Sequence, residues 1–142
     1  MKKKAKLSKL IIRIICIVLV ALLITFLYFE FSLFYLTKTI LEESYNSYGE
    51  QIPQSLADNI DSDLYQRVNY RQKTQKDVST ESTKVHITFI DYRITKATVH
   101  YKYTYALYDS NNEPIADFMG NCKIKYELSN GQWKVVDKIE EP

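Results

Sequence analysis

The sequence predicts an α+β fold, in which an N-terminal transmembrane helix is followed by two helices packed on a curved antiparallel sheet of about four strands. Three observations lead to this prediction. Residues 14–29 carry no charge, and basic residues precede them. Apolar residues then recur at helical spacing up to about residue 64. From residue 84 onward the apolar period changes to two, with turn sequences between the alternating segments.

The uncharged stretch is long enough to form the core of a membrane span. Its residues 14–29 would extend about 24 Å as a helix, against a hydrocarbon thickness of about 30 Å. Apolar residues at 10–12 and 31–34 supply the remaining length. We therefore place the transmembrane segment at residues 10–34.

Charge around this segment predicts its direction. Basic residues stand before it without an acid among them, namely Lys2, Lys3, Lys4, Lys6, Lys9 and Arg13. Basic flanks stay on the cytoplasmic side. Residues 1–9 are accordingly predicted to form a cytoplasmic tail, and residues 35–142 an extracytoplasmic α+β domain. That domain is mildly acidic although the whole chain is at +2, so no nucleic-acid partner is expected.

The segment is predicted to stay attached as a signal anchor in the cell membrane. A cleaved secretory signal has a shorter apolar centre of about 7–15 residues, followed by small residues at the cut. Here the apolar centre is longer, and "TFLYFEFSLFYL" offers no such pair of small residues. Cleavage remains the alternative, and it would shorten the mature protein by about thirty residues.

Two helices are expected next. The first continues the lipid helix, with apolar residues at helical spacing up to Tyr48. The second fits "PQSLADNIDSDLY", where Leu56, Ile60 and Leu64 share a face at spacing four. The polar residues 66–82 then form a connection, within which a short edge strand around Val68 and Tyr70 is one reading.

The remaining chain predicts an antiparallel meander. In "TKVHITF" the apolar residues alternate, and the phase slips at Ile90, which indicates a bulge. Asn130-Gly131 is a strong signal for the last hairpin. The inward positions of the other strands are predicted as Val99, Tyr101, Tyr103, Tyr105 and Leu107, then Cys122, Ile124, Tyr126 and Leu128, then Trp133, Val135 and Ile139.

The order of two helices, bent strands and a closing "NGQWKVVD" hairpin resembles the nuclear-transport-factor-two-like and cystatin-like superfamily. The resemblance covers residues 38–140 and is carried by Asn130, Gly131, Trp133, Val135 and Val136. It implies a curved sheet with a concave pocket, on a superfamily that includes enzymes, ligand binders and scaffolds. Small anchored bacterial proteins carry such domains, among them scaffold subunits of secretion and conjugation machines.

Two groups of residues are candidates for binding. Tyr101, Tyr103 and Tyr105 alternate along one strand and could line a pocket or an interface, although alternate tyrosines are also good core residues. In the polar connection, Arg67, Tyr70 and Arg71 are the candidates for a loop that contacts a partner.

Residues for catalysis or metal binding are sparse. His86 and His100 fall on outward strand positions without a third ligand, so no metal is expected. Cys16 and Cys122 lie in different segments and predict no internal disulfide. With no phosphate-binding glycine loop and no nucleophile motif, no cofactor and no enzymatic activity are expected.

The sequence thus favours a single-pass, membrane-anchored binding or scaffold module that is not an enzyme. Its expected partners are the lipid bilayer and either another envelope protein or a second copy of itself, as in a secretion or conjugation-type assembly. The alternative is a ligand-binding or hydrolytic domain that uses a tyrosine-lined pocket on the concave sheet.

Overall fold

A computed structural model describes residues 2–47, 50–68 and 80–141, with side chains from residue 9 onward except that of residue 80. The chain divides into two compact units, Met1–Ser32 and Leu33–Pro142. Helix α1 (Lys2–Asn46) runs through both units without interruption. The continuity of the lipid helix with the first helix of the domain is therefore confirmed.

The first unit consists of the N-terminal part of α1. Within Lys9–Asn46 the helix is long and apolar enough to cross a membrane, and none of its most apolar stretch is buried. Large apolar side chains from Leu10 to Phe31 are correspondingly exposed. An unburied apolar helix of this length fits a lipid environment by composition and length.

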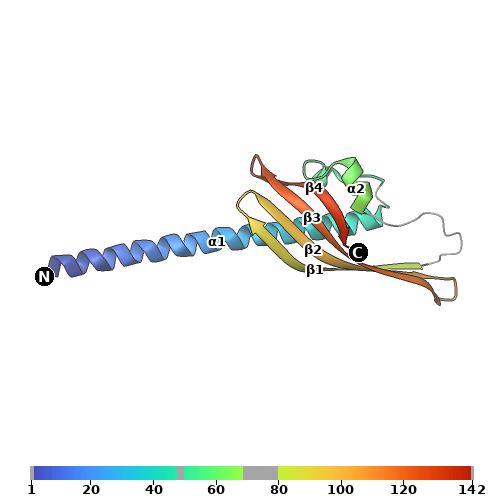
Figure 1. The fold of residues 1–142 in the computed structure, drawn as a ribbon, viewed down its shortest axis with the longest axis horizontal. Coiled ribbons are helices and arrows are strands. Elements are labelled where there is room, and N and C mark those ends of the chain that lie inside the picture. Colours follow the sequence, from blue (N-terminus) through green and yellow to red (C-terminus); the bar gives the residue numbers. More distant parts are fainter. Residues whose placement is uncertain (1, 48–49, 69–79, 142) are drawn as a thin grey trace. The chain divides into compact units, whose positions relative to one another are not determined.

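The second unit has an α+β fold. After α1 come a short 3-10 helix η1 (Gln54–Leu56) and helix α2 (Ser62–Val68). One antiparallel sheet follows in the order β1-β2-β3-β4, as seen in Figure 1. Its strands are β1 (Thr80–Arg93), β2 (Lys96–Tyr108), β3 (Pro114–Ser129) and β4 (Gln132–Glu141). The expected fold class and the number of strands are confirmed.

The second predicted helix is broken into two pieces. Pro53 precedes η1, and Asp61 begins α2 by accepting a hydrogen bond from the Leu64 amide at 2.8 Å. Leu56, Ile60 and Leu64 are all buried as expected, but they do not share one helix. Val68 ends α2 and is not part of an edge strand.

The C-terminal part of α1 covers one face of the sheet. Its core residues include two polar side chains that the apolar pattern does not reveal, Thr37 and Ser44. The Thr37 hydroxyl lies 2.7 Å from the hydroxyl of Tyr126 on β3, and Ser44 donates to the carbonyl of Tyr65 on α2. The ring of Tyr45 contacts that of Tyr105 on β2. These bonds hold the helix, the sheet and α2 together around one core.

Two bulges set which side chains face that core. In β1, Thr88 has no register partner in β2, although its hydroxyl donates to the His100 carbonyl at 3.1 Å. The inward-facing residues therefore change from Val85 and Ile87 to Ile90 and Tyr92. A slip in this strand is thus confirmed, but it lies before Phe89 rather than at Ile90. Phe89 therefore does not share the face of Val85 and Ile87, and it is 60% exposed.

In β4 the bulge lies at Val136, which has no partner in β3. Beyond it, Lys138 faces Ile124 on the inward side and is only 3% exposed, while Ile139 faces Lys123 on the outward side. The prediction of an inward Ile139 is therefore wrong, because the extra residue reverses the alternation of the strand.

Candidate functional site

The three candidate tyrosines point toward the core. Their exposed fractions are 1% for Tyr101, 7% for Tyr103 and 7% for Tyr105. Tyr101 lies opposite Cys122, and the Tyr105 ring stacks on Phe118 at 6.2 Å as well as contacting α1. Burial to this degree is typical of core side chains. A pocket or interface formed by these tyrosines stays a prediction.

Polar groups accompany these rings. The Tyr103 hydroxyl donates to Glu140 at 3.1 Å, and burial together with this carboxylate raises the pKa of Tyr103 to about 12. Burial also raises the pKa of the Cys122 thiol to about 11, so the thiol is protonated at neutral pH. Only the thiolate is a good nucleophile, so Cys122 is a poor nucleophile at neutral pH.

The candidate partner loop is described only at Arg67. This residue lies in the last turn of α2 rather than in a loop. Its guanidinium donates to the carbonyl of Lys138 at 2.9 Å and lies 3.7 Å from Asp137. Arg67 therefore links α2 to β4, while Tyr70 and Arg71 lie outside the described residues.

The two histidines lie on the outward face at different levels of the sheet. His86 pairs with Lys102, and His100 pairs with Phe89, whose ring it contacts at 5.8 Å. Among the residues that the structure describes, no group of three ligating side chains comes together. The imidazoles are therefore placed as outward strand residues, as expected.

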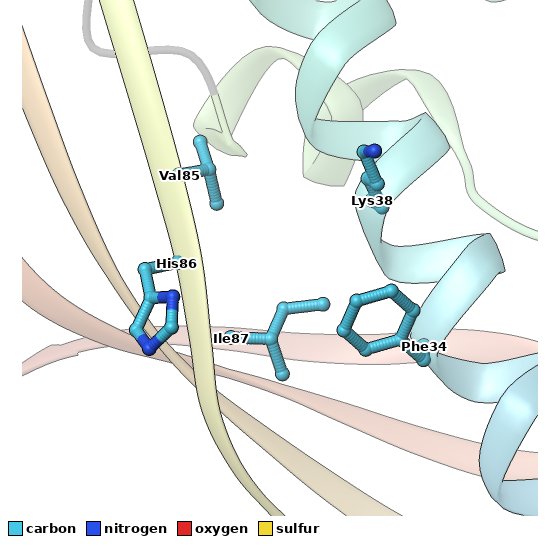
Figure 2. Close-up of a pocket in the computed structure, with 5 residues that line it drawn as sticks. All are labelled: Phe34, Lys38, Val85, His86 and Ile87. Carbon is cyan, nitrogen blue, oxygen red and sulfur yellow. The ribbon is translucent and has the colours of Figure 1, made fainter.

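A groove between α1 and β1 is the candidate functional site. It has a volume of about 200 Å³ and is lined by Phe34, Lys38, Val85, His86 and Ile87. Figure 2 shows Val85 and Ile87 pointing toward α1, with the ring of Phe34 facing Ile87 and His86 on the other side of the strand. Helical spacing of four puts Phe34 and Lys38 on one face of α1, and the strand period of two puts Val85 and Ile87 on one face of β1. The floor of the groove is thus apolar, with an ammonium group at its rim.

The electrostatics of the groove are set by lysines. Lys38 lies 3.7 Å from Glu42, one helical turn away, with both side chains more than half exposed. On the outward face of the sheet, Lys84 and Lys102 are exposed, and neither forms an ion pair with another described residue. The surroundings of the groove therefore carry a local excess of positive charge.

The two end strands of the sheet differ in how their edges are covered. On β4, the Val135 amide donates to the carbonyl of Asn59 at 2.7 Å, and the Asn59 side chain donates to the Trp133 carbonyl at 2.8 Å. Arg67 covers the same edge further along. Among the described residues, no strand pairs with the outer edge of β1. The groove consequently lies beside the outer edge of β1, which is open as far as the described residues go.

The groove is not evident from the sequence. The alternation of residues 84–89 correctly predicts Val85, His86 and Ile87 on a strand, whereas the apolar pattern places Phe34 in the membrane span and predicts no role for Lys38. An amphipathic signal was available, since Phe34 and Lys38 flank the buried Leu33 and Thr37 on α1. Which strand lies beside that helix face follows only from tertiary packing.

Comparisons with known proteins give structural likenesses only. No protein-family model matches the chain, and no curated protein matches its sequence. The intermembrane space region of the chloroplast protein ARC6 is similar at 12% identity and a TM-score of 0.45, covering 75% of this chain and 91% of that chain.

Two association domains are similar as well. That of CaMKII from C. elegans shares 15% identity at a TM-score of 0.45, over 80% of this chain and 95% of that chain. The putative calcium/calmodulin dependent protein kinase II association domain from Xanthomonas campestris shares 17% identity at a TM-score of 0.33, over 56% and 51%. With TM-scores below 0.5, these likenesses carry no argument about function, and membership in the predicted superfamily stays a prediction.

Proposed function

We propose that this protein is a membrane-anchored binding or scaffold module that is not an enzyme, with its N-terminus in the cytoplasm and its α+β unit outside. The observation that carries the proposal is α1 itself. Its N-terminal part has an apolar surface that no other described residue covers, and its C-terminal part supplies the buried residues of a separate folded unit. The N-terminal part of α1 is suited to the hydrocarbon of a bilayer, and the folded unit is suited to water.

The direction of insertion follows from charge. Basic residues cluster before the apolar stretch, and such residues are retained on the cytoplasmic side. The ion pairs on the outward face of the sheet, such as Lys96–Glu127 at 2.8 Å and Lys123–Glu141 at 2.9 Å, suit an aqueous surface.

A binding role is supported by the groove and the open edge of β1. An uncovered strand edge is a ready template for pairing with another chain, and natural proteins usually cover or charge such edges. Here the edge of β4 is covered by Asn59, whereas the edge of β1 adjoins an apolar groove. This combination is typical of a surface that receives a partner.

Protease treatment of intact cells tests the topology. With an epitope tag after residue 142, protease added outside should remove the tag while an N-terminal tag survives. A tag that stays protected in intact cells but is cut after lysis would refute the orientation. A mature product shorter by about thirty residues would refute retention of the anchor.

Photocrosslinking in intact cells tests the binding role. A photoreactive residue at position 38, on the rim of the groove, should give an adduct of higher mass in the membrane fraction. The matched control carries the same group in place of Lys134, an exposed residue near the opposite edge of the sheet. Recovery of unmodified monomer alone from both positions would refute the proposal.

A further inference from the structure

We propose that the open edge of β1 and its groove bind an extended segment of a partner protein in which apolar side chains alternate with carboxylates. This inference rests on the proposed function, because it assigns the class of partner that the binding module receives. The segment would add to the sheet as a fifth strand beside β1. Three features of the structure define its chemistry: the backbone edge, the groove and the lysines.

The backbone edge gives the mode of binding. At the other end of the sheet, Val135 already donates to Asn59 and the Lys138 carbonyl already accepts from Arg67. Over Ser82–Asp91, no described strand occupies the outer side of β1. Adding a strand there would satisfy backbone donors and acceptors that no described strand pairs with, and main-chain hydrogen bonds would then supply much of the affinity.

The groove selects one face of the added strand. Side chains of an added strand alternate between the two faces of the sheet, as those of β1 do. Those on the inward face would lie beside Val85 and Ile87 and reach the ring of Phe34, in a volume of about 200 Å³. This space is lined mainly by hydrocarbon, so it favours aliphatic side chains.

The lysines determine which side chains the outward face of the added strand would carry. Outward side chains of the added strand would lie beside Lys84 and His86, and Lys102 pairs with His86 on the next strand. Lys84 pairs with Thr104, so no carboxylate of β2 faces it. Acidic side chains at the outward positions would compensate these charges, whereas basic ones would be repelled. At the rim of the groove, Lys38 adds a further positive charge, partly offset by Glu42.

Part of β3 is paired with a described strand on one side only, that of β2. The pairing of β3 with β4 begins at Asn121, so Pro114–Gly120 has no β4 partner. That segment exposes Met119 and carries Asp117, which would repel an acidic segment. The edge of β1 carries Asp91 at one end, where Arg93 lies 3.9 Å from it, and Lys84 and His86 further along. Beside Lys84 and His86, backbone, groove and charge therefore favour the same ligand.

Binding of synthetic peptides to the full-length protein in lipid nanodiscs tests the inference. The first peptide alternates valine with glutamate, and the second alternates valine with lysine. We expect the glutamate peptide to bind and the lysine peptide not to bind. Methylating alternate backbone amides of the glutamate peptide should abolish binding, because the main-chain hydrogen bonds are lost.

Variants and hydrogen exchange locate the site. The double variant Lys84→Glu/Lys102→Glu should weaken binding of the glutamate peptide about tenfold, since each exposed pair contributes only modestly. Lys134→Glu, the matched control near the β4 edge, should change it less than about twofold. Backbone amides of Thr80–Arg93 should gain protection from exchange on binding, while those of Gln132–Glu141 should not.

Three outcomes would overturn the inference. One is equal binding of both peptides, a second is protection confined to β4, and a third is no binding of either peptide. If intact cells still give an adduct at position 38 while neither peptide binds, the proposed function survives and only the class of partner is wrong. If that adduct is a dimer of this chain, the edge belongs to a contact between copies, and the assignment to a partner segment is refuted.

Discussion

Replacing Lys138 with methionine should flatten the dependence of stability on pH. The bulge at Val136 turns Lys138 inward, where it is 3% exposed. Burial lowers the pKa of its ammonium group from 10.5 to about 8, an effect that the Glu140 carboxylate opposes. Between these two pH values the unfolded chain binds more protons at this residue than the folded chain. The free energy of unfolding therefore rises with pH in this window, by about 3 kcal/mol in total.

The assay is denaturant unfolding of the full-length protein in detergent, followed by the fluorescence of Trp133. Between about pH 7 and about pH 9.5, the wild type should gain about 2 kcal/mol of this contribution, and Lys138→Met should not. Burial raises the pKa of the Cys122 thiol from 9.0 to about 11 and also raises the pKa of Tyr101 and Tyr126, so these groups lower the stability above about pH 9, where the thiol and then the tyrosines of the unfolded chain ionise. That loss is common to both proteins.

Lys134→Met is the matched control, because Lys134 is exposed on the same strand. It should keep the rise of the wild type. The reasoning is refuted if the free energy of unfolding of Lys138→Met changes with pH in the same way as that of the wild type between these pH values. That result would mean that Lys138 reaches water in the folded protein.

Three further substitutions test the packing of the folded unit. Trp133→Ala should lower the free energy of unfolding by about 3–5 kcal/mol in denaturant titrations followed by circular dichroism, because the ring is 3% exposed; a loss below about 1 kcal/mol would place it at the surface. Tyr126→Phe removes the hydroxyl that lies 2.7 Å from Thr37 and should cost about 1 kcal/mol in the same titration, and an unchanged midpoint would mean that the pair does not stabilise the fold. Gly120→Ala places a methyl group 2.6 Å from the Tyr103 ring and should lower the thermal midpoint, with a cost of about 1–3 kcal/mol; no change would show that the ring moves aside freely.

Alternating apolar residues in the sequence predicted the strands well, because each inward side chain of a strand is itself buried in the core. Val99, Tyr101 and Tyr103 are buried as that pattern requires. The slip at Ile90 likewise revealed the bulge of β1, since the apolar residues themselves change parity there. In the sequence, the only sign of the bulge of β4 is the adjacent apolar pair Val135 and Val136. The apolar Ile139 then led to the wrong prediction of which side chains point inward beyond the bulge.

The helices and the candidate site depend more on context. The break between η1 and α2 follows from Asn59, whose backbone and side chain bond to β4, and a local pattern cannot show that distant contact. Thr37 and Ser44 enter the core because each meets a hydrogen-bonding partner on another element. The groove combines residues 34 and 38 with residues 85–87, and its existence is a property of packing between segments far apart in the chain.

The uninterrupted α1 has a consequence for biosynthesis. The helix leaves the ribosome before the strands, yet its Thr37 hydroxyl meets Tyr126 only 89 residues later in the chain. Leu33, Ile40 and Leu41 on the same helix stay uncovered until the strands arrive, so the core closes late and over a long chain separation. A nascent chain stalled before β3 would leave these apolar side chains exposed, which makes it prone to aggregation until the strands are made.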